Sequence, residues 1–443
     1  MITDFCYLAA CAMHGAAPDA QQVASMDMEA LWKMAHAHKM TAMIAMALEQ
    51  VSAHPEEVVK NWDQWKHAKD FAICRRMLFD AERAQIISYM EEQGIWYAPL
   101  KGILIQDFYP GYGMREMADN DLLFDPAGRK TMQAYMKDRG YELDEEGEAV
   151  HDTYLKKPVY NFELHVGLFA RKYHDEQLAA YFDNAKAKLQ KDPDNGYGWH
   201  YTADDLYIYV TAHAYKHYSA RGTGIRTITD NYVFRHTQAE VLHWDYIDGE
   251  LEKLGMLDFD RTLRTLSESL LSATEPVALD SLSRKERDML TYMAGCGVYG
   301  SMSHAVENRM RGMQKEGSRM TWGAKGRYLL RRLFPDGRRI RAYSKTAERY
   351  PILIPAVYVK RIVTAVFHKR KYIKMELDAV GKIKEKYRKN KRTGFAKTGE
   401  KPLDARLFLC YSTKACVDVV FFACTISGYG STECWNGQRS GQL

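Results

Sequence analysis

Between residues 94 and 168 the hydrophobic positions fall in short runs whose spacing changes repeatedly. The apolar runs at 94–100 and 122–124 have the length expected of short buried strands. Residues 103–109 have helical spacing, and a second helix is expected from Asp125-Pro126 to about 139, since proline suits the first turn of a helix. Gly140 to Leu143 then restarts a strand. This alternation predicts a small mixed sheet with helices between its strands.

Two further runs, 153–155 and 160–166, flank Lys156, Lys157 and Pro158 and predict a hairpin. Side chains alternate between the two faces of a strand, so Glu163 and His165 are expected to share one face. The opposite face of that strand is apolar and consists of Phe162, Leu164 and Val166.

The rest of the chain has mainly helical patterns, so the expected fold class is α+β, with a small mixed β-sheet core between N-terminal and C-terminal helical regions. From Asn61 to Met90 a long amphipathic helix is expected, with Phe71, Cys74, Leu78 and Ala81 at helical spacing. The predicted regions are an N-terminal helical region (1–92), the core (93–185), a helical domain (186–367), a basic helical tail (368–392) and a tail of different composition, rich in Gly, Ser, Thr and Cys (393–443).

The charge of the 443 residues is nearly balanced, with 62 Lys and Arg against 57 Asp and Glu. Composition therefore does not require a polyanionic partner. The first twenty residues lack a cationic segment and carry Asp4, which argues against a signal peptide, and no run is long and apolar enough for a membrane span. The cysteines have neither a metal-ligand spacing nor a disulfide pattern, so a cytoplasmic location is expected.

The stretch Met117-Ala118-Asp119-Asn120-Asp121 runs straight into the apolar residues Leu122 to Phe124. Asp119 and Asp121 are two residues apart, so on a strand their carboxylates point the same way and repel each other. A hard cation such as Mg²⁺ would offset that repulsion. The alternative is a polar turn that leads into a strand.

The neighbourhood of Asp119 and Asp121 favours the metal interpretation. Upstream, a strand ends at Lys101-Gly102 and a helix follows, an arrangement in which backbone N–H groups meet a phosphate. Downstream, Glu163 on the polar face of a predicted strand supplies a third carboxylate for a two-metal site.

These motifs together resemble an uncharacterised bacterial nucleotidyltransferase family of the DNA polymerase beta-like superfamily, over about residues 25 to 365. The resemblance implies transfer of a nucleoside monophosphate from an NTP to a hydroxyl-bearing acceptor, with release of pyrophosphate. The motifs are, in chain order, Leu100-Lys101-Gly102, Tyr109-Pro110, Arg115, Asp119-x-Asp121-Leu122-Leu123 and Phe162-Glu163-Leu164-His165.

The family resemblance also implies residue roles. Asp119, Asp121 and Glu163 would be catalytic and would bind Mg²⁺ or Mn²⁺. The nucleotide, with ATP as the expected donor, would be bound by Lys101, Gly102 and Arg115. The acceptor, a sugar, small molecule, peptide or protein, would lie near His165, His213, His217 and Asp230.

One departure from the family leaves the identity of the nucleotide open. The wider superfamily usually has Gly-Ser or Gly-Gly on the turn that binds phosphate, where this chain has Lys101-Gly102, and the spacing to Asp119 is longer. His213 and His217, four residues apart, are also compatible with ordinary packing histidines on a helix.

Two other functions remain open at this stage. One is a nucleotide-binding regulator, or an antitoxin-like partner of another protein, with little turnover. The other is a protein that binds RNA or an anionic surface through a basic, amphipathic helical region. The basic residues of that region are Arg327, Arg331, Arg332, Arg338, Arg339 and Arg341.

Overall fold

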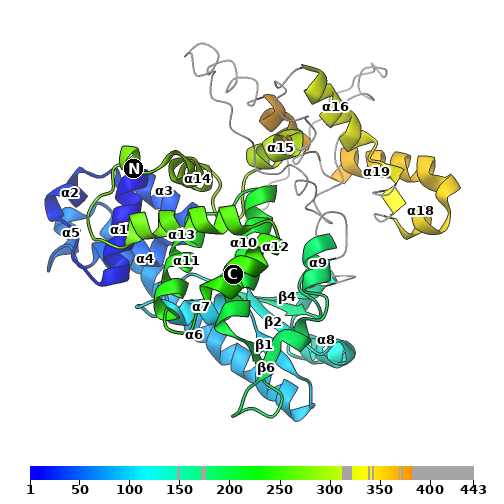
Figure 1. Ribbon diagram of the computed structural model, residues 1–443, viewed down its shortest axis with the longest axis horizontal. Coiled ribbons are helices and arrows are strands. Elements are labelled where there is room, and N and C mark those ends of the chain that lie inside the picture. Colours follow the sequence, from blue (N-terminus) through cyan, green and yellow to red (C-terminus); the bar gives the residue numbers. More distant parts are fainter. Residues whose placement is uncertain are drawn as a thin grey trace, which may run out of the picture. The chain divides into compact units, whose positions relative to one another are not determined.

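The computed structural model describes residues 1–146, 150–170, 176–311, 322–337, 340–341, 344–368, 370 and 373–381. The chain forms two compact units, and the first contains the described residues up to 311 (Figure 1). The predicted tail 393–443, most of the basic tail 368–392, and Arg338 and Arg339 lie outside the described residues.

The first unit contains a five-stranded mixed sheet, in agreement with the predicted α+β class. Its strands are β1 (Tyr97–Pro99), β2 (Asn120–Phe124), β3 (Glu142–Glu146), β4 (His151–Lys156) and β5 (Tyr160–His165). In space their order is β1-β2-β5-β4-β3. β2 and β5 run parallel, whereas the other neighbouring pairs are antiparallel. The hairpin expected around Pro158 is β4–β5.

The connections within the sheet also follow the hydrophobic pattern. After β1 the chain forms α7 (Gly102–Ile105) and the short 3₁₀ helix η1 (Gln106–Phe108). After β2 come η2 (Pro126–Gly128) and α8 (Arg129–Asp138), with Pro126 in the first turn of η2. Because β1 and β2 pair antiparallel, Lys101, which follows the end of β1, lies next to Asp121 near the start of β2.

One face of the sheet is apolar and packs against two helices. It presents the even-numbered residues of β2, β4 and β5 to α8 and to α6 (Trp62–Glu92). The buried side chains of this layer are Phe79, Ile86, Met90, Leu122, Phe124, Met132, Met136, Tyr154, Phe162 and Leu164. Burial of these large side chains is the main stabilisation of the sheet.

The long helix α6 was expected, but its predicted apolar face is wrong. Phe71 and Leu78 are 52% and 42% exposed, whereas Ala72 and Phe79, one position further along, are buried. The buried side chains recur every seven residues, at Trp65, Ala72, Phe79 and Ile86. Two different hydrophobic cores contact this helix, and together they select the face that is buried.

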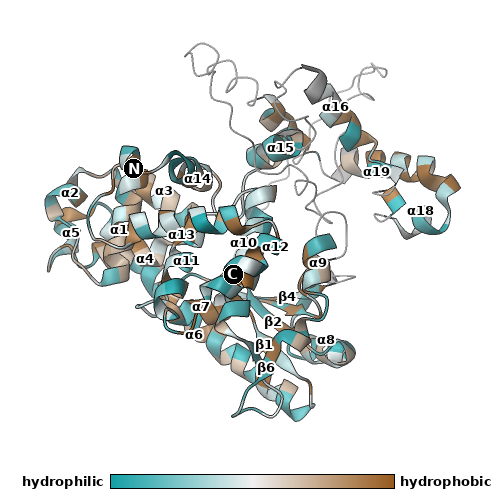
Figure 2. Ribbon diagram, viewed as in Figure 1, coloured by the Kyte–Doolittle hydropathy of each residue, from teal (hydrophilic) through white to brown (hydrophobic). Residues whose placement is uncertain are grey.

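The residues before α6 form five helices that pack into a larger core. α1 (Ile2–His14) and α4 (Thr41–Leu48) are its most apolar members, as Figure 2 shows. The Ala- and Met-rich stretch around Leu31–Leu48 is divided at Lys39, which has a φ of 54°. The other helices are α2 (Ala20–Ser25), α3 (Met28–His38) and α5 (Pro55–Val58).

The chain that follows β5 returns to the sheet at its β1 edge. A small hairpin, β6 (Leu189–Lys191) and β7 (Trp199–Tyr201), was not predicted; it bridges to β1 through Tyr97 and Gly198. The helix α9 (Glu176–Tyr181) precedes this hairpin. The helices after it are α10 (Ala203–Ala220), α11 (Arg226–Thr237), α12 (Trp244–Lys253), α13 (Leu257–Leu271), α14 (Arg284–Ala294) and α15 (Met302–Arg311).

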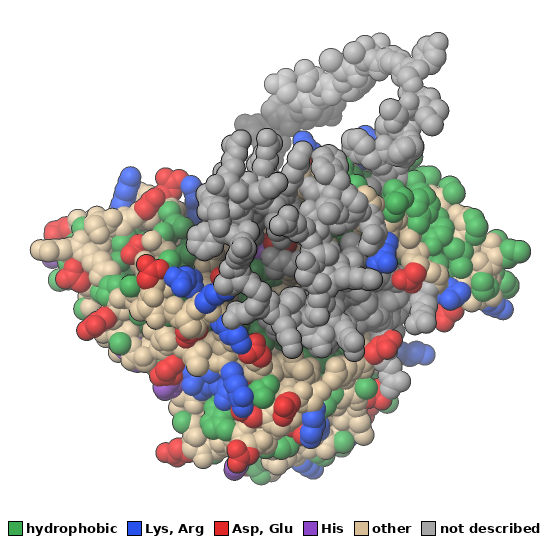
Figure 3. Space-filling model, turned by 45° about the horizontal axis from the view of Figure 1, so that its top comes forward, with side chains coloured by type: hydrophobic (Ala, Val, Ile, Leu, Met, Phe, Trp, Pro, Cys, Tyr) green, Lys and Arg blue, Asp and Glu red, His purple; other side chains and the backbone are tan. Residues whose placement is uncertain are grey.

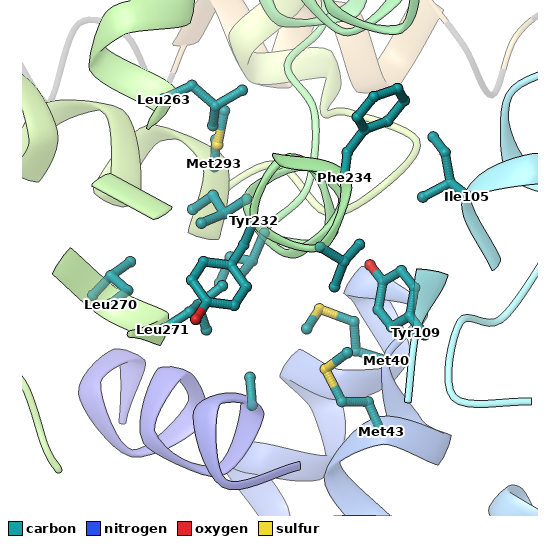
Figure 4. Packing of buried hydrophobic residues seen from close by; sticks show 14 of the residues in the cluster. Met40, Met43, Ile105, Tyr109, Tyr232, Phe234, Leu263, Leu270, Leu271 and Met293 are labelled. Carbon is teal, nitrogen blue, oxygen red and sulfur yellow. The ribbon is translucent and has the colours of Figure 1, made fainter. Parts of the chain in front are cut away.

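The core formed by these helices includes residues from both ends of the first unit. Figure 4 shows Ile105 and Tyr109 beside α11, which carries Tyr232 and Phe234. Met43 of α4 belongs to the same core. The segment that carries Lys101 is therefore anchored to α11 as well as to the sheet.

The described part of the second unit is helical. It contains α16 (Trp322–Leu333), α18 (Lys345–Arg349), η5 (Pro351–Leu353), α19 (Ile354–His368) and a helical stretch at 373–381. None of the helices in the described ranges combines the length and hydropathy needed to cross a bilayer. On the face of the molecule seen in Figure 3, acidic and basic side chains are interspersed over the described parts.

Candidate functional site

The parallel pairing of β2 with β5 brings two of the predicted carboxylates together. Asp121 is in register with Glu163, so both side chains project from the same face of the sheet. This face is opposite the apolar layer, because residues 122 and 162 point the other way. Asp121 is 3% exposed, while the Glu163 side chain is 22% exposed.

Lys101 contacts this pair from the turn between β1 and α7. Its Nζ donates to Asp121 Oδ1 at 2.8 Å. The backbone of Lys101 has a φ of 46° and a ψ of −115°, a conformation that non-glycine residues rarely adopt. Strained backbone of this kind is typically maintained where a side chain must be held in a defined position. The turn therefore aims the ammonium group at Asp121.

His165 is the second cationic partner of Asp121. Its Nε2 lies 2.8 Å from Asp121 Oδ1 and 3.6 Å from Glu163 Oε2. Burial lowers the pKa of His165, but the hydrogen bonds to Asp121 and Glu163 outweigh this effect, and the pKa is above its ordinary value. The other ring nitrogen, Nδ1, is buried and has no hydrogen-bond partner among the residues that the structure describes.

The pKa values of the three carboxylates of the site are shifted in different directions. Burial raises the pKa of Asp119 to about 6, with further contributions from Asp121 and Glu163. Burial also raises the pKa of Asp121, but Lys101 and His165 overcome it and keep the pKa below its ordinary range. Burial also raises the pKa of Glu163, but His165 and the positive charge of Lys101 together outweigh it, and the pKa is lowered. Asp119 is therefore the one of these three carboxylates whose charged form is disfavoured.

His151 completes the cluster and was missed by the sequence analysis. It pairs directly with His165 across β4 and β5, and the two ring centroids are 4.9 Å apart. Burial and the neighbouring His165 lower its pKa to about 4. The sequence did contain an indication. In a hairpin that turns around Pro158, residue 151 falls opposite residue 165.

α10 supplies the predicted histidines of the acceptor side. The Nε2 atoms of His213 and His217 lie 3.2 Å apart on successive turns. Burial, followed by the positive charge of Lys101, lowers the pKa of His213 well below its ordinary value. For His217, which is partly open to solvent, desolvation followed by the positive charge of Lys216 lowers the pKa. Both imidazoles are therefore neutral near Lys101 at ordinary pH.

Arg115 and Asp230, predicted for opposite sides of the site, contact each other. Arg115 donates from Nε and Nη2 to the two oxygens of Asp230 at 2.7 and 3.0 Å. Tyr109 donates to the same carboxylate at 2.7 Å. Arg115 also lies close to Gly102, since an added Cβ there would be 2.7 Å from Arg115 Nη1. In this structure the group fixes the turn that carries Lys101 against α11.

The donor set of this face fits a hard divalent cation. Asp119, Asp121 and Glu163 offer carboxylate oxygens, the ligands that Mg²⁺ prefers. Burial, together with the negative charges of Asp121 and Glu163, raises the pKa of Asp119, so its carboxylate lies in a site crowded with negative charge. A bound cation would relieve that crowding.

Comparison with known proteins gave one result. A family model described as an uncharacterised nucleotidyltransferase matches residues 24–272. This range includes every strand of the sheet and the helices α10 and α11. Searches among curated proteins and among solved structures returned no match.

Proposed function

Because the chain belongs to the uncharacterised nucleotidyltransferase family, we propose that it transfers a nucleoside monophosphate from an NTP to an acceptor hydroxyl and releases pyrophosphate. The observation that carries this proposal is the register of β2 with β5, which sets Asp121 beside Glu163, with Asp119 directly before β2. Carboxylates from two adjacent strands on one polar face support the proposal, since they can supply oxygen ligands to two metal ions about 3.5–4 Å apart.

The chemistry follows from these positions. The acceptor oxygen forms a bond to the α-phosphorus of the NTP, and the bond from that phosphorus to the β-phosphate oxygen breaks. Pyrophosphate leaves, and the proton of the acceptor hydroxyl passes to water. Asp119, Asp121 and Glu163 would hold Mg²⁺ or Mn²⁺, which when bound supplies positive charge at the triphosphate and at the acceptor oxygen.

Lys101 and His165 have distinct proposed roles. Lys101 is already positioned by its turn, and its ammonium group hydrogen-bonds to Asp121. When the nucleotide binds, this group also donates a hydrogen bond to a phosphate oxygen. His165 hydrogen-bonds to Asp121 and lies 3.6 Å from Glu163, and so orients both carboxylates. Arg115 acts through Tyr109 and Asp230 to hold the turn, and a direct nucleotide contact remains part of the prediction for this residue.

The acceptor is proposed to approach from the side of α10. His213 and His217 are neutral there and offer hydrogen bonds without adding positive charge. ATP is the proposed donor, and the acceptor class is a sugar, another small hydroxyl-bearing molecule, a peptide or a protein.

Calorimetric titration of the four NTPs into the full chain tests the proposal. Each titration is made with Mg²⁺ and with EDTA, for the wild type and for Asp119→Ala, with Asp138→Ala on the exposed end of α8 as the matched control. We expect Mg²⁺-dependent binding of one NTP that Asp119→Ala abolishes and Asp138→Ala retains.

Two other outcomes would change the proposal. If no NTP binds under either condition, the catalytic assignment is wrong. If an NTP binds but no pyrophosphate is released with any acceptor pool, the regulator with little turnover replaces the enzyme.

A further inference from the structure

A second type of ligand set lies beside the three predicted metal-binding carboxylates. Within the described residues, His151, Glu163 and His165 form a group whose possible ligand atoms all lie within 4.8 Å of one another. His165 Nε2 is 3.6 Å and His151 Nε2 is 4.0 Å from Glu163 Oε2. Asp119 does not belong to this group.

The backbone fixes this group. His151 and His165 are directly opposed across the β4–β5 pair, and Thr153 is opposed to Glu163. Opposed residues on paired strands project from the same face, so all three ligands point the same way without any loop having to order. A site on strands is held more precisely than one on a loop.

The ligand chemistry differs from that of a magnesium site. Two imidazole nitrogens and one carboxylate oxygen suit Mn²⁺, Zn²⁺ and similar transition-metal ions, whereas Mg²⁺ prefers an all-oxygen shell. Ligand atoms around a tetrahedral ion with bonds of about 2.0–2.1 Å are about 3.3 Å apart. The two separations from Glu163 Oε2, 3.6 and 4.0 Å, are somewhat longer, and the histidine nitrogens lie within 4.8 Å of each other, so a bound ion would draw the three ligand atoms closer together.

Two contacts support an ion at this position in particular. Lys101 donates to Asp121, so Asp121 already has a cation at hydrogen-bonding distance. The ion-pair partners of Glu163 within the described ranges are the two histidines. A metal ion bound at His165 Nε2 would take the place of the hydrogen bond between that atom and Asp121, and the ring proton would then reside on Nδ1.

We propose that His151, Glu163 and His165 form a binding site for a divalent transition-metal ion, Mn²⁺ or Zn²⁺, next to the carboxylate site. The inference rests on the proposed function only in that the two sites share Glu163. It assigns His151 a role as a direct ligand, and it predicts that the protein takes a histidine-bound ion in the absence of nucleotide.

The test uses the full chain, freed of metal with a chelator, and no nucleotide. MnCl₂ and ZnCl₂ are titrated separately by calorimetry, and the Mn²⁺ complex is examined by pulsed electron paramagnetic resonance. The variants are His151→Ala and the more conservative His151→Gln, with His67→Ala on the exposed side of α6 as the matched histidine control.

We expect the wild type and His67→Ala to bind Mn²⁺ with nitrogen hyperfine coupling in the spectrum. Both His151 variants should bind at least about tenfold more weakly, since even outer contacts of metal ligands are worth that much. The nitrogen coupling should decrease in both variants. Unchanged affinity and unchanged coupling in the His151 variants would overturn the inference.

Failure of this inference can be separated from failure of the proposed function. Asp119→Asn should retain histidine-bound Mn²⁺ while it loses Mg²⁺-dependent NTP binding. If NTP binding is normal but no nitrogen coupling is found, the metals are held by carboxylates alone and only the histidine site is wrong. If nitrogen coupling is found but no NTP binds, the metal site stands and the transferase proposal is wrong.

Discussion

The two faces of the five-stranded sheet are made of alternate residues of the same strands, yet they have opposite properties. In β5, Phe162 is fully buried against Phe79 and Tyr141, while its neighbour Glu163 is part of the cluster with Asp121 and His165. The apolar face gains stability from burial, whereas the polar face concentrates charge at a cost in stability. The packed apolar face keeps the strands rigid and thereby fixes the positions of the charged side chains on the polar face.

Two buried aspartates sharpen this comparison. Asp152 projects from the apolar face and is 1% exposed, and Asp121 projects from the polar face and is 3% exposed. Asp152 receives two hydrogen bonds from Arg129 and one from Gln133, so its carboxylate is satisfied by neutral and cationic donors. Asp121 also has hydrogen-bond partners, Lys101 and His165, but unlike Asp152 it lies beside the carboxylates of Asp119 and Glu163. Equal burial therefore does not imply an equal role.

The largest expected effect is that of Asp121→Asn on turnover. Without this carboxylate the proposed metal ions would be held less well, and less positive charge would stabilise the reacting phosphate. The rate of pyrophosphate release should therefore fall by about 10³-fold or more. The fold should be retained, as measured by circular dichroism and thermal unfolding. Full activity in this variant would show that the metal assignment is wrong.

Substitution of the adjacent residues Phe162 and Glu163 separates the two faces within one strand. Phe162→Ala should lower the free energy of unfolding by about 3–5 kcal/mol, because it leaves a cavity in the apolar layer. Glu163→Gln should unfold close to the wild type in urea but lose turnover while retaining most nucleotide affinity. If Glu163→Gln were the less stable of the two variants, the assignment of stability to the apolar face and of the reaction to the polar face would be wrong.

Asp152→Asn should behave as a structural substitution despite removing a buried carboxylate. We expect a loss of about 2–3 kcal/mol in the free energy of unfolding, since the charge-assisted hydrogen bonds from Arg129 are weakened. The rate of pyrophosphate release per folded molecule should stay at the wild-type value. A rate loss as large as that of Asp121→Asn would mean that both faces serve the reaction.

The smallest expected effect is a gain in stability from Asp119→Asn without metal. Since the pKa of Asp119 is raised to about 6, the folded state binds this proton more tightly than the unfolded state, and the carboxylate destabilises the fold above that pH. In EDTA at pH 7.5 the variant should be more stable than the wild type by about 1–2 kcal/mol. The difference should vanish as the pH falls toward 4, which urea unfolding at several pH values would measure.

The local part of the fold and the carboxylates were predictable from the sequence. The alternation of Phe162 and Leu164 with Glu163 and His165 predicted a two-sided strand, and Pro158 marked its hairpin. These features depend on residues close together along the chain. The choice of Asp119, Asp121 and Glu163 remains a prediction about function, which the geometry supports but activity must test.

The contacts that could not be predicted join distant segments. The parallel pairing of β2 with β5 and the ion pair between Arg115 and Asp230 depend on how the whole chain packs, which periodicity does not report. The positive φ of Lys101 is unusual for lysine and leaves no trace in composition. The buried face of α6 was misassigned because two cores compete for it, and a local pattern favours Phe71 and Leu78 equally well.

The helix α6 has a consequence for how the first unit unfolds. Its first turns bury Trp62 and Trp65 in the larger core, and its later turns bury Phe79, Ile86 and Met90 under the sheet. A continuous helix shared by two cores makes each depend on the other, so amide protons in α1 and in β5 should exchange with solvent in the same cooperative step. A chain shortened to begin after α6 would lose one wall of the sheet, and the helices before it would lose the anchor that joins them to the site.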